Sequence, residues 1–170
     1  PCAALTCVTG PSGSGKSTLV METLAPLARA ATSPRCAGAG EVAAHRKYLN
    51  LINVFPVADG DTGTNLSATL NEMVRLPARS ASFSQTLNQL SQSAMRGAHG
   101  NSGIIFASYV NGLAVEGKPY ERVTVAQFAG VAFNAVKHLY QSVDHPEEGT
   151  MMSLIRDWAA FLHRNHPSYP

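Results

Sequence analysis

The sequence predicts a mostly α-helical protein, an antiparallel helical bundle preceded by a short strand, a glycine-rich loop and a helix. From Glu41 onward, apolar residues recur at the spacing of amphipathic helices in about six segments. The connections between these segments are rich in Pro, Gly, Asn and Asp, which favour turns. Before Glu41 the pattern differs, since one apolar run leads directly into a glycine-rich stretch.

The first 40 residues form the segment that precedes the bundle. Ala3–Val8 is a short apolar run that suits a buried strand, and Gly10-Pro-Ser-Gly-Ser-Gly-Lys-Ser17 fits the Walker A pattern of phosphate-binding loops. Ser17–Ala31 then reads as a helix that Pro26 would kink or end. Residues 32–40 have the composition of a linker. We therefore expect two parts, a P-loop-like segment with a linker over residues 1–40 and a helical domain over residues 41–170.

The helical part follows from periodicity. Each predicted helix carries apolar residues three or four positions apart, and the stretch 102–114 is apolar nearly all round, which predicts a buried helix. The expected helices are Glu41–Ile52, Asn65–Leu76, Ser84–Arg96, Ser102–Ala114, Val123–Val143 and Thr150–Arg164.

Three polar motifs lie in alternate loops of this bundle. They are Asn53-Val-Phe-Pro-Val-Ala-Asp-Gly-Asp-Thr-Gly-Thr-Asn65, Gly97-Ala-His-Gly-Asn-Ser-Gly-Ile104 and Pro146-Glu-Glu-Gly-Thr150, and each one leads into a helix. In an antiparallel bundle, alternate loops lie at the same end. The sequence therefore predicts that the three motifs meet at one rim.

The first motif predicts a divalent cation site. Asp59 and Asp61 are separated by one glycine, and Mg²⁺ binds through one or two carboxylates together with phosphate oxygens. A loop that runs into a helix also offers backbone N–H groups to phosphate. A turn with helix-capping carboxylates is the alternative for this pair, and helix capping alone is the alternative for Thr64 and for Asn101–Gly103.

The three motifs resemble the nucleotide site of the dihydroxyacetone kinase L-subunit superfamily, and most closely the N-terminal domain of bacterial fatty acid kinase. The resemblance covers roughly Glu41 to Leu162. It implies a kinase domain that binds ATP and Mg²⁺, with Asp59 and Asp61 as catalytic metal ligands. Asn53 stands where sugar-kinase members carry a third Asp, which implies a weaker or indirect metal role. His99 stands where the family commonly has Arg.

The same resemblance implies further nucleotide contacts and a reaction. The γ-phosphoryl of ATP would pass to a fatty acyl carboxylate held by an acyl-binding partner protein, or to a small ketone such as dihydroxyacetone with a kinase partner subunit. It also implies an eight-helix barrel, so a chain with about six helices is expected to be truncated at its C-terminal end. The implied nucleotide-binding residues are Thr62, Gly63, Thr64, Asn65, Gly100, Asn101, Ser102, Gly103, Glu148, Gly149 and Thr150.

Residues 3–31 separately resemble the Walker A segment of the excinuclease ABC ATPase, a DNA-repair enzyme. In a working P-loop, the turn around Gly15 and the side chain of Lys16 would contact phosphates, and Ser17 would hold Mg²⁺. The helical part lacks a credible second acidic strand. Two alternatives to the kinase remain, a P-loop ATPase fragment related to that DNA-repair enzyme and a non-catalytic truncated fusion. The chain begins at Pro1 rather than at Met, which fits either a fragment or a fusion.

Composition argues against a nucleic-acid binder, a disulfide-rich protein and a membrane-spanning protein. The net charge of +2 includes no basic patch of the kind that nucleic-acid binders carry. Cys2, Cys7 and Cys36 match no zinc pattern, and an odd number argues against a disulfide framework, so we expect a reducing, cytoplasmic setting. No apolar run approaches the ~20 residues of a membrane helix.

Overall fold

The computed structural model describes residues 37–53, 57–75 and 82–165, and every regular element in these ranges is an α-helix. Gly15, Lys16 and Ser17 lie outside the described residues, as do the rest of residues 1–36. The linker predicted over residues 32–40 is wrong at its end, because the chain is already helical from Ala37. The helices are α2 (Ala37–Ala44), α3 (Arg46–Leu51), α4 (Thr62–Val74), α5 (Phe83–Arg96), α6 (Gly100–Gly117), α7 (Val125–Gln141) and α8 (Met151–Asn165).

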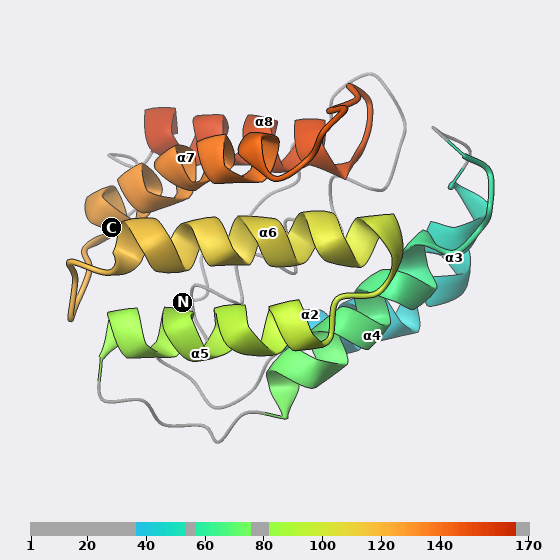
Figure 1. Cartoon of the computed structure of the whole chain (residues 1–170), viewed down its shortest axis with the longest axis horizontal. Coiled ribbons are helices and arrows are strands. Elements are labelled where there is room, and N and C mark those ends of the chain that lie inside the picture. The colour runs from blue at the N-terminus through green and yellow to red at the C-terminus, as the bar shows by residue number, and fades with distance from the viewer. Residues whose placement is uncertain (1–36, 54–56, 76–81, 166–170) are drawn as a thin grey trace.

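Helix α6 is the centre of the bundle. It packs against α4, α5, α7 and α8, while α2 and α3 pack on α4 at the far edge. Figure 1 shows α5, α6 and α7 running back and forth as an antiparallel set, with α4 crossing obliquely at one end. The helical bundle predicted from the sequence is thus confirmed for the described residues. Within these residues, α8 lies at one edge on α6 and α7, and α2 and α3 lie at the other.

The core forms around the buried face of α6. Phe106, Tyr109 and Val110 are each at most 1% exposed, and the Tyr109 hydroxyl donates to the Ala132 carbonyl oxygen at 3.0 Å. The prediction that this helix is buried all round is wrong on one stripe, because Ile104 and Val115 are about half exposed. Periodicity could not locate that stripe, since apolar residues occupy it as well.

The ends of two helices are fixed by their own sequence. Ser82 begins α5, and its hydroxyl accepts the N–H of Gln85 at 3.3 Å. Thr124 begins α7 in a capping box with Gln127, in which each side chain bonds the other residue's backbone N–H. Such caps satisfy donors that a helix leaves unpaired at its first turn.

The helix predicted over residues 41–52 is in fact two helices. The chain leaves helical geometry at His45 (φ −95°, ψ 8°) and starts again at Arg46. Neither Gly nor Pro marks this break in the sequence, so the pattern predicted one continuous helix. The break redirects α3 so that Asn50, near its end, reaches the first turn of α4.

Candidate functional site

The three motifs converge on one cavity of about 610 Å³. Its walls come from the loop before α4, from the first turn of α6, and from the loop before α8 together with the first turns of α8. The meeting of alternate loops at one end of the bundle is therefore confirmed. The sequence-predicted residues that line the cavity are Asn53, Asp59, Asp61, Thr62, Asn101, Ser102, Gly149 and Thr150.

Asn53 organises the wall that carries the carboxylates. Its amide nitrogen donates to Asp59 Oδ1 at 2.5 Å, and its amide oxygen accepts from the Thr62 hydroxyl at 2.6 Å. A carboxylate can only accept, so the amide must turn its NH₂ group toward Asp59. Asn53 is 9% exposed, whereas Asp59 is exposed. The buried amide thus fixes one oxygen of Asp59, a residue that lines the cavity.

Asp61 is tied to the α6 side of the cavity through Asn65. The Asn65 amide donates to Asp61 Oδ2 at 2.6 Å. The same Asn65 side chain lies against the backbone of Gly100, where a Cβ atom would come within 2.6 Å of Asn65 Cγ. Gly100 also has a positive φ of 57°, which L side chains rarely adopt. Asn65 therefore acts as a spacer between two motifs rather than as a lining residue.

The first turn of α6 offers unused backbone donors. His99 begins the helix without a side-chain cap, and no hydrogen bond within the described residues uses the N–H groups of Asn101 and Ser102. Both residues line the cavity, and the Ser102 hydroxyl donates to the Thr62 hydroxyl at 3.3 Å. Unpaired N–H groups and the helix dipole make such a turn favourable for an anion.

The first turn of α4 differs, because its donors are already used. The N–H groups of Gly63 and Thr64 both donate to the side-chain oxygen of Asn50, at 2.7 and 3.1 Å. The Thr64 hydroxyl accepts from the Asn50 amide at 2.9 Å and is exposed outside the cavity. The structure thus places Gly63 and Thr64 away from the site, together with Gly103, which packs under Thr69.

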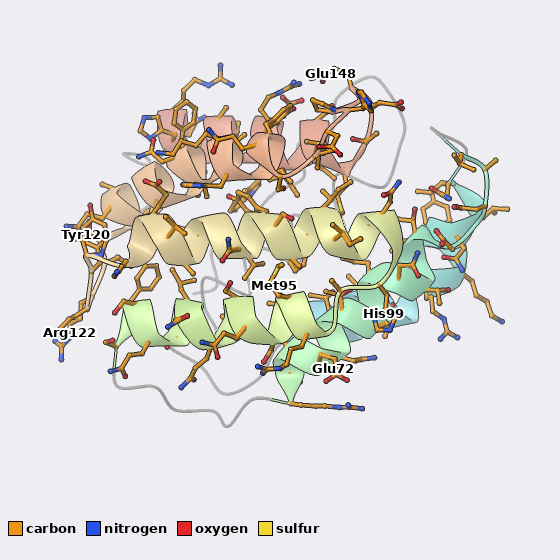
Figure 2. All side chains as sticks on the ribbon, viewed as in Figure 1. Glu72, Met95, His99, Tyr120, Arg122 and Glu148 are labelled. Atoms are coloured by element: carbon orange, nitrogen blue, oxygen red, sulfur yellow. The ribbon has the colours of Figure 1, made fainter. Side chains whose placement is uncertain are left out.

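The loop before α8 forms the third wall. The Thr150 hydroxyl accepts the N–H of Met152 at 3.2 Å and donates to the Glu147 carbonyl oxygen, so it caps α8 while lining the cavity. Glu148, which Figure 2 labels at the end of the bundle near α8, does not line the cavity and accepts from Arg156 at 2.6 Å. Hydrogen bonds from Ser153 and Arg156 hold the pKa of Glu148 below its usual value. These contacts fix the loop.

The structure adds lining residues that the sequence did not single out. Asp144, Glu147 and Asp157 line the cavity with His145, which we expected to be a surface or interhelix residue. Together with Asp59 and Asp61 they give it five carboxylates. No Lys or Arg is among the described residues that line it. Asp144 and His145 directly precede the Pro146–Thr150 motif and Glu147 lies within it, and that position is the one signal that marked them.

His99 does not enter the cavity. Its ring nitrogen Nδ1 lies 2.6 Å from the Gly97 carbonyl oxygen, its backbone N–H donates to Thr69, and the side chain is exposed. Figure 2 shows it at the same end of the bundle as Glu148. The position that the resemblance would expect to carry Arg therefore supplies no fixed positive charge to this cavity.

The groups in this site that could bind a metal ion are oxygen atoms. No cluster of three or more His, Cys, Asp or Glu side chains suited to a metal ion occurs in residues 37–53, 57–75 and 82–165. The cavity instead presents a set of two carboxylates, Asp59 and Asp61, and the amide of Asn53, whose oxygen already accepts from Thr62, holds Asp59 in place. This set suits Mg²⁺, which takes few protein ligands and keeps water or phosphate oxygens.

Comparison with known proteins identifies the family of the chain. The family model of the DAK2 domain matches residues 56–168. An uncharacterized protein of Mycoplasma pneumoniae is 33% identical over 128 residues, covering 70% of this chain and 23% of that protein. An uncharacterized protein of Staphylococcus saprophyticus is 33% identical over 126 residues, covering 72% of this chain and 22% of that protein. Protein YloV of Bacillus subtilis is 30% identical over 125 residues, covering 72% of this chain and 23% of that protein. The chain spans less than a quarter of the length of these relatives.

Proposed function

The chain belongs to the family of the DAK2 domain, and from this premise we propose that it binds ATP with Mg²⁺ in the three-loop cavity and serves phosphoryl transfer. The observation that carries the proposal is the convergence of the carboxylate wall and the open first turn of α6 on one cavity. Phosphoryl transfer needs positioning and charge neutralisation more than covalent chemistry, and these two walls offer both.

The charge of the cavity supports a metal-dependent nucleotide. Five carboxylates and no lining Lys or Arg among the described residues would repel a bare triphosphate. When bound, Mg²⁺ would neutralise phosphate charge and stabilise the charge of the transferring group. Asp59 and Asp61 would hold it, and Asn53 would keep Asp59 in place through its amide. The role of Asn53 is then indirect, since its oxygen already accepts from Thr62.

The first turn of α6 would hold a phosphate group. The N–H groups of Asn101 and Ser102 are unpaired in the described structure and lie on the cavity wall. The Ser102 hydroxyl would add a side-chain donor by giving up its 3.3 Å bond to the Thr62 hydroxyl. Glycine-preceded helix N-termini bind phosphate in this way because several N–H groups point at one oxygen cluster.

An apolar part of the cavity would accept the base. Ile105, Val143, Met151 and Leu154 line it from α6 and from both sides of the loop before α8. Flat aromatic ligands bind to such surfaces because they remove apolar area from water. Gly149 and Thr150 line the same cavity from the loop before α8.

We propose a fatty acyl carboxylate, held by an acyl-binding partner protein, as the phosphoryl acceptor; a small ketone with a kinase partner subunit is the second candidate. Both require the acceptor to reach the cavity from outside the described residues. The match covers 23% of each of two relatives, which leaves room for acceptor-binding parts elsewhere in those proteins.

Calorimetric titration with Mg-ATP tests the nucleotide proposal. The intact chain is compared with the Asp59→Ala/Asp61→Ala variant, with Glu72→Ala as a carboxylate control outside the cavity, and with Lys16→Ala. We expect binding that needs Mg²⁺ and is lost only in the double Asp variant. Unchanged affinity in that variant would refute the proposal. Loss in Lys16→Ala alone would instead support the P-loop alternative, which the family match does not favour.

A further inference from the structure

The N-cap residue of α4 does not cap its own helix. An Asp at this position normally accepts the N–H groups of the second and third helical residues, which here are Gly63 and Thr64. Asp61 makes no such bond. Its carboxylate accepts from Asn65 instead and lines the cavity.

Asn50 of α3 takes over the capping. One side-chain oxygen accepts from both N–H groups, at 2.7 and 3.1 Å, and the amide nitrogen donates to the Thr64 hydroxyl at 2.9 Å. Asn50 is 13 and 14 residues before these partners, so the cap comes from another element. Three of the four hydrogen bonds that an Asn amide can readily make are therefore used at one helix end.

Close packing of α3 on α4 makes this reach possible. A Cβ atom at Gly63 would lie 2.8 Å from Leu49 Cβ and 2.9 Å from the Asn50 side-chain oxygen, and it would also overlap the Arg46 carbonyl oxygen. Real Cβ contacts are longer than this, so only glycine allows α3 to approach so closely. The requirement for Gly63 in the first motif is thus a packing requirement of the Asn50 cap.

We propose that Asn50 is a positioning residue that caps α4 in place of Asp61 and thereby keeps the Asp61 carboxylate in the cavity. The inference deepens the proposed Mg-nucleotide site and rests on it for its functional consequence. Its structural part, the exchange of one cap for another, is independent of any ligand. Without Asn50, the N–H groups of Gly63 and Thr64 would be unpaired, and Asp61 holds the N-cap position from which a side chain accepts them.

A double-mutant cycle on the ligand-free chain tests the exchange. Asn50→Ala, Asp61→Ala and the double variant are compared with the unmodified chain by urea denaturation. In the presence of Asp61, Asn50→Ala should lower the folding constant by less than about 5-fold, because Asp61 becomes the cap. In the Asp61→Ala background the same change should lower it by about 5–30-fold, since no cap remains. Additive effects would overturn the proposal.

Mg-ATP titration tests the functional consequence. Asn50→Ala should weaken Mg-ATP binding by about 10–100-fold, the usual cost of losing a group that orients a metal ligand. Ser82→Ala removes a cap from α5 and Asn71→Ala removes an exposed Asn of α4, and both should bind as the unmodified chain does. Unchanged affinity in Asn50→Ala would overturn the positioning role. If the unmodified chain itself fails to bind, the proposed function falls, while the cycle still decides the cap exchange.

Discussion

Asn65 and Gly100 meet side chain to backbone, so closely that a Cβ atom at residue 100 would overlap the Asn65 amide. The contact joins the first turn of α4 to the first residue of α6, which lie far apart in the sequence. It also holds Asp61 on the cavity side, because the same amide donates to that carboxylate. The spacing between the wall that carries Asp61 and the first turn of α6 thus depends on one residue without a side chain.

Gly100→Ala should therefore destabilise the protein. The positive φ of 57° alone costs about 1–2 kcal/mol for an L side chain, and the overlap with Asn65 adds to it. Urea denaturation measures the change. Gly130→Ala in α7 is the matched control, since a Cβ there meets nothing within 4 Å. That control should stabilise the protein by up to about 1 kcal/mol through helix propensity, and equal effects of the two changes would contradict the prediction.

Tyr109→Phe should cost about 1 kcal/mol of the free energy of unfolding, because the buried hydroxyl donates to the Ala132 carbonyl oxygen at 3.0 Å. Burial raises the pKa of Tyr109 well above its usual value, so the group stays a neutral donor at all ordinary pH values. Thermal or urea unfolding measures the loss. Tyr48→Phe, at an exposed position, should leave stability unchanged.

Glu116 should make stability depend on pH. Hydrogen bonds from His138 and then Lys137, at 2.7 and 2.9 Å, hold the pKa of Glu116 below its usual value. A carboxyl whose folded-state pKa is lowered stabilises the protein fully above the unfolded-state pKa. That contribution disappears as the pH falls through the folded-state pKa.

Glu116→Gln should accordingly be less stable than the unmodified chain at neutral pH by up to about 1 kcal/mol. The two proteins should converge at acid pH, where the glutamic acid is neutral as well. Urea denaturation across a pH series measures the difference. A difference that persists at low pH would show that the loss arises from packing rather than from charge. Glu121→Gln, in the loop before α7, is the exposed control.

Asn53→Asp should lower the stability of the metal-free protein and increase its stabilisation by Mg²⁺. The new carboxylate would lose the hydrogen bond to Asp59 and repel it, which lowers stability without metal. Mg²⁺ would then bind three carboxylates, so we expect a larger rise of the melting temperature on adding Mg²⁺ than in the unmodified chain. Asn88→Asp on the exposed face of α5 should show no such rise. An unchanged response to Mg²⁺ in Asn53→Asp would place the metal elsewhere.

Much of the fold was predictable because each helix buries its own stripe. The apolar positions of residues 84–96 and 150–164 predicted α5 and α8 to within one residue at each end. The break at His45 was not predictable, because no Gly or Pro stands there and the apolar spacing continues across it. A helix cap can be predicted from the sequence where the capping residue directly precedes its helix, as Thr124 precedes α7. The cap of α4 could not be predicted in this way, because it comes from Asn50 of another helix.

The sequence by itself determined which loops form the site, since helix count and alternation decide which ends of a bundle meet. It placed Asp59, Asp61, Asn101 and Ser102 on one rim through periodicity and local turn chemistry alone. Only the tertiary structure decided which groups of those loops face the cavity. Side-chain direction depends on partners far away in sequence. Asn50 therefore draws Thr64 out of the site and leaves Asp61 in it.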